Sequence, residues 1–161
     1  MWKYREVNAY DSIGLHDCRA DSVRVDGSDL VFDFPDGFWI APVSGHIDCD
    51  RPVKTGAAQL CFRGVFQEDP FDDIDVYKTT CVFGKPVFCR RVQLKYPTFL
   101  KMFQSEKYEL EFTAEYHMSI SSLYQCRIRK KNSGVDAECQ FGVTAKSIEY
   151  RWNEILYDHV W

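Results

Sequence analysis

The chain of 161 residues lacks any apolar run that approaches the roughly 20 residues of a membrane-spanning helix. Its first twelve residues, MWKYREVNAYDS, carry charges where a secretory signal needs an apolar stretch. We therefore expect a cytoplasmic protein with no membrane partner. Internal repeats, low-complexity segments and linkers are also absent, so the sequence predicts a single domain over residues 1–161.

The local signatures of common enzymes are missing too. The sequence contains no phosphate-binding loop, no dinucleotide-binding glycine motif, no zinc-protease motif and no serine nucleophile elbow. These absences favour a non-enzymatic protein without a cofactor. They leave an enzyme open, because many active sites have no local motif.

Paired cysteine motifs are absent although cysteine itself is not rare. The number of cysteines is odd, and no C-x-x-C pair occurs among Cys18, Cys49, Cys61, Cys81, Cys89, Cys126 and Cys139. A disulfide framework or a zinc knuckle needs even numbers or close pairs. Several of these cysteines fall on the apolar phase of strand patterns, so we expect reduced, structural thiols.

The composition is that of a folded, β-rich protein. Hydrophobic residues make up 45% and charged residues 27% of the chain, which excludes wholesale disorder. The net charge of −4 argues against nucleic acid as a partner. Aromatic residues make up 16%, and such residues pack well on pleated surfaces.

Residues 107–118 show the clearest alternation in the chain. One phase is apolar from Tyr108 to Met118, and the other is polar from Lys107 to His117. Strict alternation predicts a strand with one buried and one exposed face. A short loop at 120–122 would pair this strand with residues 123–131. Glu111 and Glu115 would then face basic residues of the second strand.

Further segments extend this pattern to an all-β fold. Residues 17–41 predict a three-stranded meander, residues 74–83 and 86–94 a hairpin, and residues 97–104 a short helix after Pro97. The apolar phase shifts near Ser147, which indicates a bulge or a strand that bends into another sheet. We predict an all-β or β-rich α+β protein, a single antiparallel sandwich or barrel of about eight strands with one helix.

Two short clusters contain residues that bind metals or activate thiols. His16 and Cys18 precede the first strand of the meander, and His46, Asp48 and Cys49 lie in the loop 42–56. Imidazole, thiolate and carboxylate together suit a metal ion or a cysteine nucleophile with a histidine base. Neighbours on an extended segment point apart, so the competing interpretation is structural histidines that hydrogen-bond turns.

An acidic cluster surrounds Pro70. Its members are Glu68, Asp69, Asp72, Asp73 and Asp75. The cluster lacks the spacing of a calcium-binding loop, and a solvated loop is the simplest interpretation. The alternative is a docking surface for a basic protein partner, which charge would steer to the site.

Residues 15–37 carry a resemblance to known proteins. The segment LHDCR is followed by alternating apolar residues, Asp26-Gly27, a second alternating run and Asp36-Gly37. This pattern resembles small uncharacterised bacterial β-rich families, some of which are immunity proteins of polymorphic toxin systems. The resemblance implies a cytoplasmic protein that acts by binding another protein. It assigns no site residue.

These observations leave three functional hypotheses. The first is a non-enzymatic protein-binding domain, of immunity or accessory type, in which a homo-oligomer is also open. The second is a small-ligand carrier or sensor, because inward aromatic side chains can line a cavity as well as fill a core. The third is an enzyme or metal site that uses His46, Asp48 and Cys49.

Overall fold

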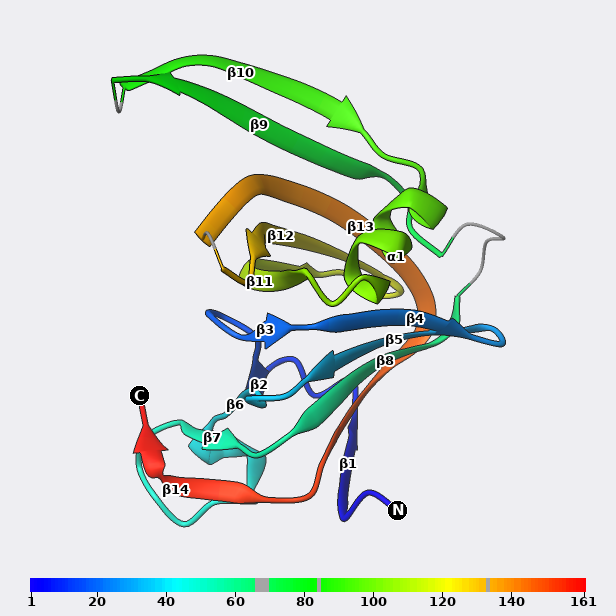
Figure 1. Ribbon diagram of the computed structural model, residues 1–161. Helices are drawn as coiled ribbons and strands as arrows, with labels where there is room; N and C mark the ends of the chain where they lie inside the picture. Colours follow the sequence, from blue (N-terminus) through cyan, green and yellow to red (C-terminus); the bar gives the residue numbers. More distant parts are fainter. Residues whose placement is uncertain (66–69, 84, 133) are drawn as a thin grey trace.

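The computed structural model describes residues 1–65, 70–83, 85–132 and 134–161, without the side chains of residues 80–82, 86 and 134–136. In this part of the chain, fourteen strands form one sheet of ten strands and one of four, and all strand pairs are antiparallel. Figure 1 shows the large sheet folded over, so that β11 and β12 lie above β4, β5 and β8.

The large sheet is built around one long strand, β13 (Gly134–Trp152). Its main path runs in the order β3 (Arg19–Ala20), β11 (Tyr108–His117), β12 (Ser121–Lys130), β13, β8 (Ala58–Val65), β5 (Asp29–Phe34) and β4 (Ser22–Asp26). Three strands lie off this path: β1 (Tyr4–Val7) and β9 (Ile74–Val82), which pair with β13, and β10 (Lys85–Gln93), which pairs with β9.

β13 belongs to both halves of the folded sheet. Its first part, up to Thr144, pairs with β12, and its second part, from Ala145, pairs with β8. Ala145 and Ile148 are both buried although they are three residues apart, so the inward phase changes between them. Opposite this point, Gly64 has a φ of +59°. The predicted strand that bends from one sheet into another near Ser147 is thus confirmed.

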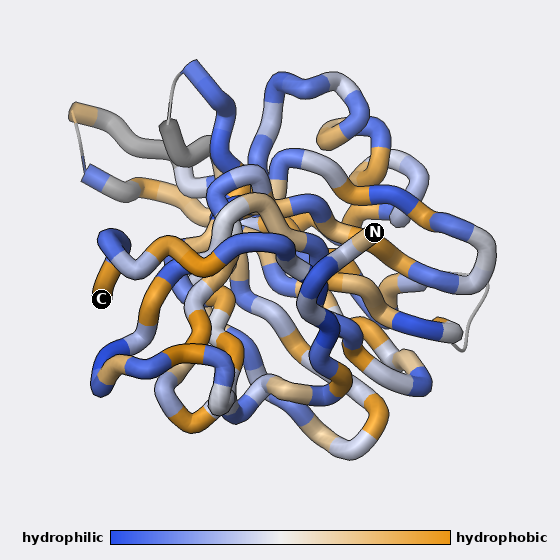
Figure 2. The backbone as a smooth tube through the Cα atoms, turned by 90° about the horizontal axis from the view of Figure 1, so that it is seen from below, coloured by the Kyte–Doolittle hydropathy of each residue, from blue (hydrophilic) through white to orange (hydrophobic). Residues whose placement is uncertain are grey.

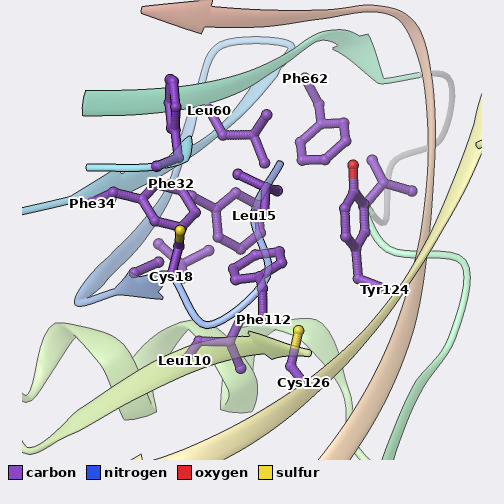
Figure 3. Packing of buried hydrophobic residues seen from close by; sticks show 14 of the residues in the cluster. Leu15, Cys18, Phe32, Phe34, Leu60, Phe62, Leu110, Phe112, Tyr124 and Cys126 are labelled. Atoms are coloured by element: carbon purple, nitrogen blue, oxygen red, sulfur yellow. The ribbon is translucent and has the colours of Figure 1, made fainter. Parts of the chain in front are cut away.

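The hydrophobic core fills the space between the two halves. Phe32 of β5 stacks on Phe141 of β13, with ring centroids 6.0 Å apart, and Phe62 of β8 meets Tyr124 of β12 edge-on at 5.6 Å. Figure 3 shows Phe62 and Tyr124 pointing toward each other from strands on either side of the core. Aromatic pairs in such offset and edge-on arrangements are favourable beyond the area that they bury.

The small sheet consists of β2 (Ile13–Gly14), β6 (Trp39–Ile40), β7 (Val53–Thr55) and β14 (Ile155–Val160), in the order β14-β7-β6-β2. The predicted meander is correct for β4 and β5 but wrong for its third strand, because β6 pairs with β2 and β7 instead of β5. The loop 42–56 contains the 3-10 helix η1 (Pro42–Ser44) as well as β7.

The only α-helix in the described residues is α1 (Tyr96–Gln104), which confirms the predicted short helix. Pro97 lies in its first turn, and Phe99, Leu100 and Phe103 are its buried residues. Their spacing places all three on one face, which contacts β4 and β11. The helix therefore covers one end of the folded sheet.

The hairpin of β11 and β12 forms as predicted, but its register differs. Glu111 pairs with Arg127, and the register shifts by one residue between Phe112 and Ala114. This bulge reverses the alternation, so Tyr116 and Met118 are exposed, contrary to the prediction that they face the core. The predicted meeting of opposite charges holds for Glu111, whose carboxylate lies 2.9–3.3 Å from Arg19, Arg127 and Arg129.

The all-β class with one short helix is confirmed, whereas the large sheet does not close into a barrel. Figure 2 shows hydrophobic and hydrophilic positions interleaved along the strands, as expected for sheets with one buried face. None of the helices in the described residues is long and apolar enough to cross a membrane.

Candidate functional site

His16 and Cys18 are held beside β11 by main-chain hydrogen bonds. The amide of Asp17 donates to the carbonyl of Phe112, and the amide of Phe112 donates to the carbonyl of Cys18. His16 Nδ1 donates to the carbonyl of Thr113 at 2.8 Å, so this nitrogen carries a hydrogen. The Cys18 thiol is fully buried and lies 3.6 Å from the carbonyl of His16. The structure therefore places the two side chains in different surroundings.

Burial makes Cys18 a poor nucleophile. Desolvation raises the pKa of its thiol to about 12, so the reactive thiolate is scarce at neutral pH. We expect iodoacetamide at pH 8 to modify the exposed Cys89 in the native protein and to leave Cys18 unmodified. Peptide mass spectrometry measures both sites, and the unfolded protein, in which both thiols react, is the control. Equal labelling of the two native thiols would contradict this assignment.

His46, Asp48 and Cys49 make separate contacts. His46 Nε2 lies 2.6 Å from a carboxylate oxygen of Glu6, and its ring is edge-on to Trp152 at 5.4 Å. The Cys49 thiol donates to the carbonyl of Arg51 at 3.1 Å, and Asp48 is exposed. Within the described ranges, no group of three His, Cys, Asp or Glu side chains is close enough to hold a metal ion.

Of the acidic residues around Pro70 that the structure describes, Asp72 and Asp73 are exposed and Asp75 is buried. Asp72 accepts a hydrogen bond from Thr144, Asp73 from Gln93, and Asp75 is buried against Arg91 at 2.6 Å. Each of these carboxylates is thus engaged at the base of β9. Glu68 and Asp69 lie outside the described residues.

The reversed phase of β11 turns two polar side chains inward. His117 Nε2 lies 3.1 Å from Glu115 Oε2, and His117 Nδ1 lies 2.9 Å from the hydroxyl of Ser122. Because a carboxylate only accepts hydrogen bonds, Nε2 donates to Glu115, and in a neutral ring Nδ1 accepts from Ser122. In this arrangement the carboxylate orients the imidazole and the imidazole accepts the serine proton, as in enzymes that use a serine nucleophile.

The surroundings of this Glu115–His117–Ser122 relay favour a structural role. Ser122 is only 4% exposed, and the ring of Tyr10 stacks on the imidazole with centroids 4.6 Å apart. The adjoining pocket has a volume of about 10 Å³, which is the size of one water molecule. An acyl substrate therefore has no room at the hydroxyl, and we interpret the relay as a support for the turn between β11 and β12.

A larger pocket lies on the other side of Glu115, where the small sheet meets β11. Its volume is about 350 Å³, and we call it the tryptophan pocket; its lining consists of residues 10–14, His16, Trp39, Ala41, Pro52, Glu115 and Trp161. The indole rings of Trp39 and Trp161 stand at 67° to each other, with centroids 4.9 Å apart. The pocket therefore has two aromatic walls beside the carboxylate of Glu115.

The second candidate is a two-stranded arm formed by β9 and β10. Only residues 74–77 of β9 pair with β13, and from Lys78 onward the described residues of the arm pair with each other. Figure 1 shows the arm projecting beyond the folded sheet. Its outer part exposes Phe83, Val87 and Phe88, the first of them completely. An isolated hairpin is at best marginally stable in water, so such an arm is typical of a contact element.

The arm also differs in charge from the rest of the molecule. Residues 76–93 of the arm contain four lysines and arginines, and none of the 24 acidic residues of the chain lies between residues 76 and 105. At the base of the arm, Arg91 is paired with Asp75. Farther out, Lys85 and Arg90 are exposed beside the apolar side chains. The arm is thus a basic, apolar projection on an acidic protein.

Comparison of the chain with protein-family models, curated proteins and solved structures finds no match. The structure thus directs attention to two sites that the sequence analysis missed. The arm had a readable signal in the absence of acidic residues over residues 76–105. The tryptophan pocket had none, since its walls come from five distant parts of the chain.

Proposed function

We propose that the protein is a non-enzymatic, cytoplasmic binding domain whose arm docks onto an acidic surface of a protein partner. The observation that carries this proposal is the outer part of the arm, where three large apolar side chains are exposed on a hairpin that projects beyond the folded sheet (Figure 1). Exposed apolar groups of this kind mark interaction sites. An immunity or accessory role is the concrete form suggested by the resemblance of residues 15–37.

The basic charge of the arm predicts an acidic surface on the partner. Lys85 and Arg90 flank Phe88, so a complementary surface offers an apolar pocket with carboxylates at its rim. A protein surface suits the arm better than nucleic acid because the net charge of −4 opposes the approach of a polyanion. The acidic residues 72, 73 and 75 are engaged within the chain and serve to anchor the arm.

Capture of the partner by the tagged full chain tests the proposal. We expect one stoichiometric protein that the variant Phe83→Ser/Phe88→Ser retains at least about tenfold more weakly, because hot-spot aromatics dominate interfaces. The charge variant Lys85→Glu/Arg90→Glu should weaken capture as well, and added salt should mimic it.

The matched control is Val43→Ser/Tyr157→Ser, which removes two exposed apolar side chains elsewhere. It should retain the partner fully. Equal capture by the arm variants, or captured material that nuclease removes, would refute the proposal. Light scattering of the purified protein shows whether the partner is a second copy of this chain.

A further inference from the structure

We propose that the tryptophan pocket binds a quaternary ammonium group. This inference goes beyond the protein-binding function of the arm, because none of the pocket residues belongs to β9 or β10. It rests on the juxtaposition of two indole rings with two carboxylates in an open pocket of about 350 Å³. A trimethylammonium group is small enough to enter a pocket of this size.

The two tryptophans are fixed as the walls of the pocket. The indole nitrogen of Trp39 donates to the carbonyl of His16 at 3.2 Å, and its main chain pairs with Gly14. The amide of Trp161 donates to the carbonyl of Pro52 at 3.0 Å. Trp161 is nevertheless 56% exposed, so part of its ring remains open to a ligand. Hydrogen bonds therefore hold the Trp39 ring and the main chain of Trp161 at the pocket.

The charge of the lining favours a cation. Asp11 and Glu115 line the pocket, and the described lining residues include neither lysine nor arginine. Glu115 is held in place by the amide of Leu15 at 2.9 Å and by His117 on its other oxygen. Each carboxylate oxygen accepts more than one contact, so the anchored group still presents negative charge to the pocket.

Trp39 already takes part in one cation–π contact. The ammonium of Lys54 lies 5.4 Å from the centroid of its ring, although Lys54 does not line the pocket. A tryptophan face is the strongest aromatic partner for a cation, and quaternary ammonium groups are recognised by such aromatic walls. An anion would meet two carboxylates here, and a purely apolar ligand would gain nothing from their charge.

Titration of the full chain with choline, followed by the shift of its methyl proton resonance, tests the inference. The control ligand is 3,3-dimethylbutan-1-ol, which replaces the quaternary nitrogen by carbon. We expect choline to bind about tenfold more tightly than the neutral alcohol, since only choline gains the cation–π and carboxylate attraction. Equal affinity, or no binding of choline, would overturn the proposal.

Variants then assign the binding to this pocket. Trp161→Leu should weaken choline binding about tenfold, while Tyr157→Leu, a change of an exposed aromatic outside the lining, should leave it unchanged. Glu115→Gln removes the negative charge that the Leu15 amide and His117 hold in place. Asp11→Asn removes the exposed negative charge of the lining and leaves the Glu115–His117–Ser122 relay intact. Unchanged binding in Trp161→Leu and Asp11→Asn would place the cation elsewhere and refute the assignment.

The ammonium group has two natural sources, which a second titration distinguishes. One is a free small molecule such as choline, and the other is the side chain of a trimethylated lysine in a protein. Tighter binding of a trimethyl-lysine peptide than of choline identifies the protein source, and the reverse order identifies the small molecule. An unmethylated peptide of the same sequence controls for contacts of its main chain.

Discussion

Replacing Gly37 by alanine should cost about 4 kcal/mol or more of folding free energy and leave much of the protein unfolded at 37 °C. Gly37 has a φ of +67°, and an added Cβ would lie well inside contact distance of Thr55 and the carbonyl of Gly56. Thr55 cannot retreat, because its hydroxyl accepts a hydrogen bond from the amide of Phe38 in the buried interior. Denaturant unfolding followed by tryptophan fluorescence measures the loss.

Gly27→Ala is the matched control for this prediction. Gly27 has nearly the same backbone conformation, with a φ of +62°, but nothing lies within 4 Å of an added Cβ. Its cost is therefore only that of a left-handed backbone, about 1 kcal/mol. Similar losses in the two variants would show that backbone conformation alone, and not the approach of Thr55, governs position 37.

Glu149→Gln should destabilise the protein by about 3 kcal/mol at pH 7, the second large effect. Glu149 is 7% exposed, and its carboxylate lies 2.7 Å from both Arg63 Nε and Arg151 Nε. Hydrogen bonds from Arg151, and then from Arg63, lower the pKa of Glu149 to about 2 despite the opposing desolvation. The neutral amide would leave the largely buried Arg151 without its carboxylate partner, whereas Arg63 would keep its contact with Asp29.

The same carboxylate predicts how stability depends on pH. Because its pKa is lowered by folding, its contribution is complete above the ordinary value of 4.5 and is lost as the pH falls toward 2. Glu149→Gln should flatten this acid limb in thermal melts recorded between pH 7 and 2. Glu138→Gln, an exposed position on the same strand, is the control and should keep it. An unchanged acid limb in Glu149→Gln would contradict the shift.

Much of the local structure could be predicted because it depends on neighbouring residues. The hairpin of β4 and β5 follows from alternating apolar residues around Asp26-Gly27, and the face of α1 follows from the spacing of Phe99, Leu100 and Phe103. The change of phase near Ser147 was likewise visible, because a strand that crosses between two halves must exchange its inward and outward positions.

The bulge after Phe112 could not be predicted, because apolar residues continue on the same phase beyond it. Tyr116 and Met118 look like core residues, yet they are exposed while Glu115 and His117 turn inward. The hydrogen bond that Glu115 accepts from the distant amide of Leu15 favours the reversed phase. That contact spans a hundred positions of sequence and has no local signature.

The candidate sites could likewise be predicted only in part. His16, Cys18, His46, Asp48 and Cys49 were singled out by residue type, but their contacts depend on where β11, β1 and the loop 42–56 meet. Lysines and arginines of the arm were visible as a segment without acidic residues, whereas its projection depends on β9 pairing with β13 over only four residues. Pairing of that length is a tertiary property.

The long β13 has a consequence for how the molecule is divided. Its first part pairs with β12 and β9, and its second part pairs with β8 and β1. The two halves of the folded sheet therefore share this strand. A cut within its first part would interrupt the pairing with β12 and β9, and a cut within its second part would interrupt the pairing with β8 and β1, exposing backbone groups of the interior. The backbone of this one strand therefore ties the two halves of the folded sheet together.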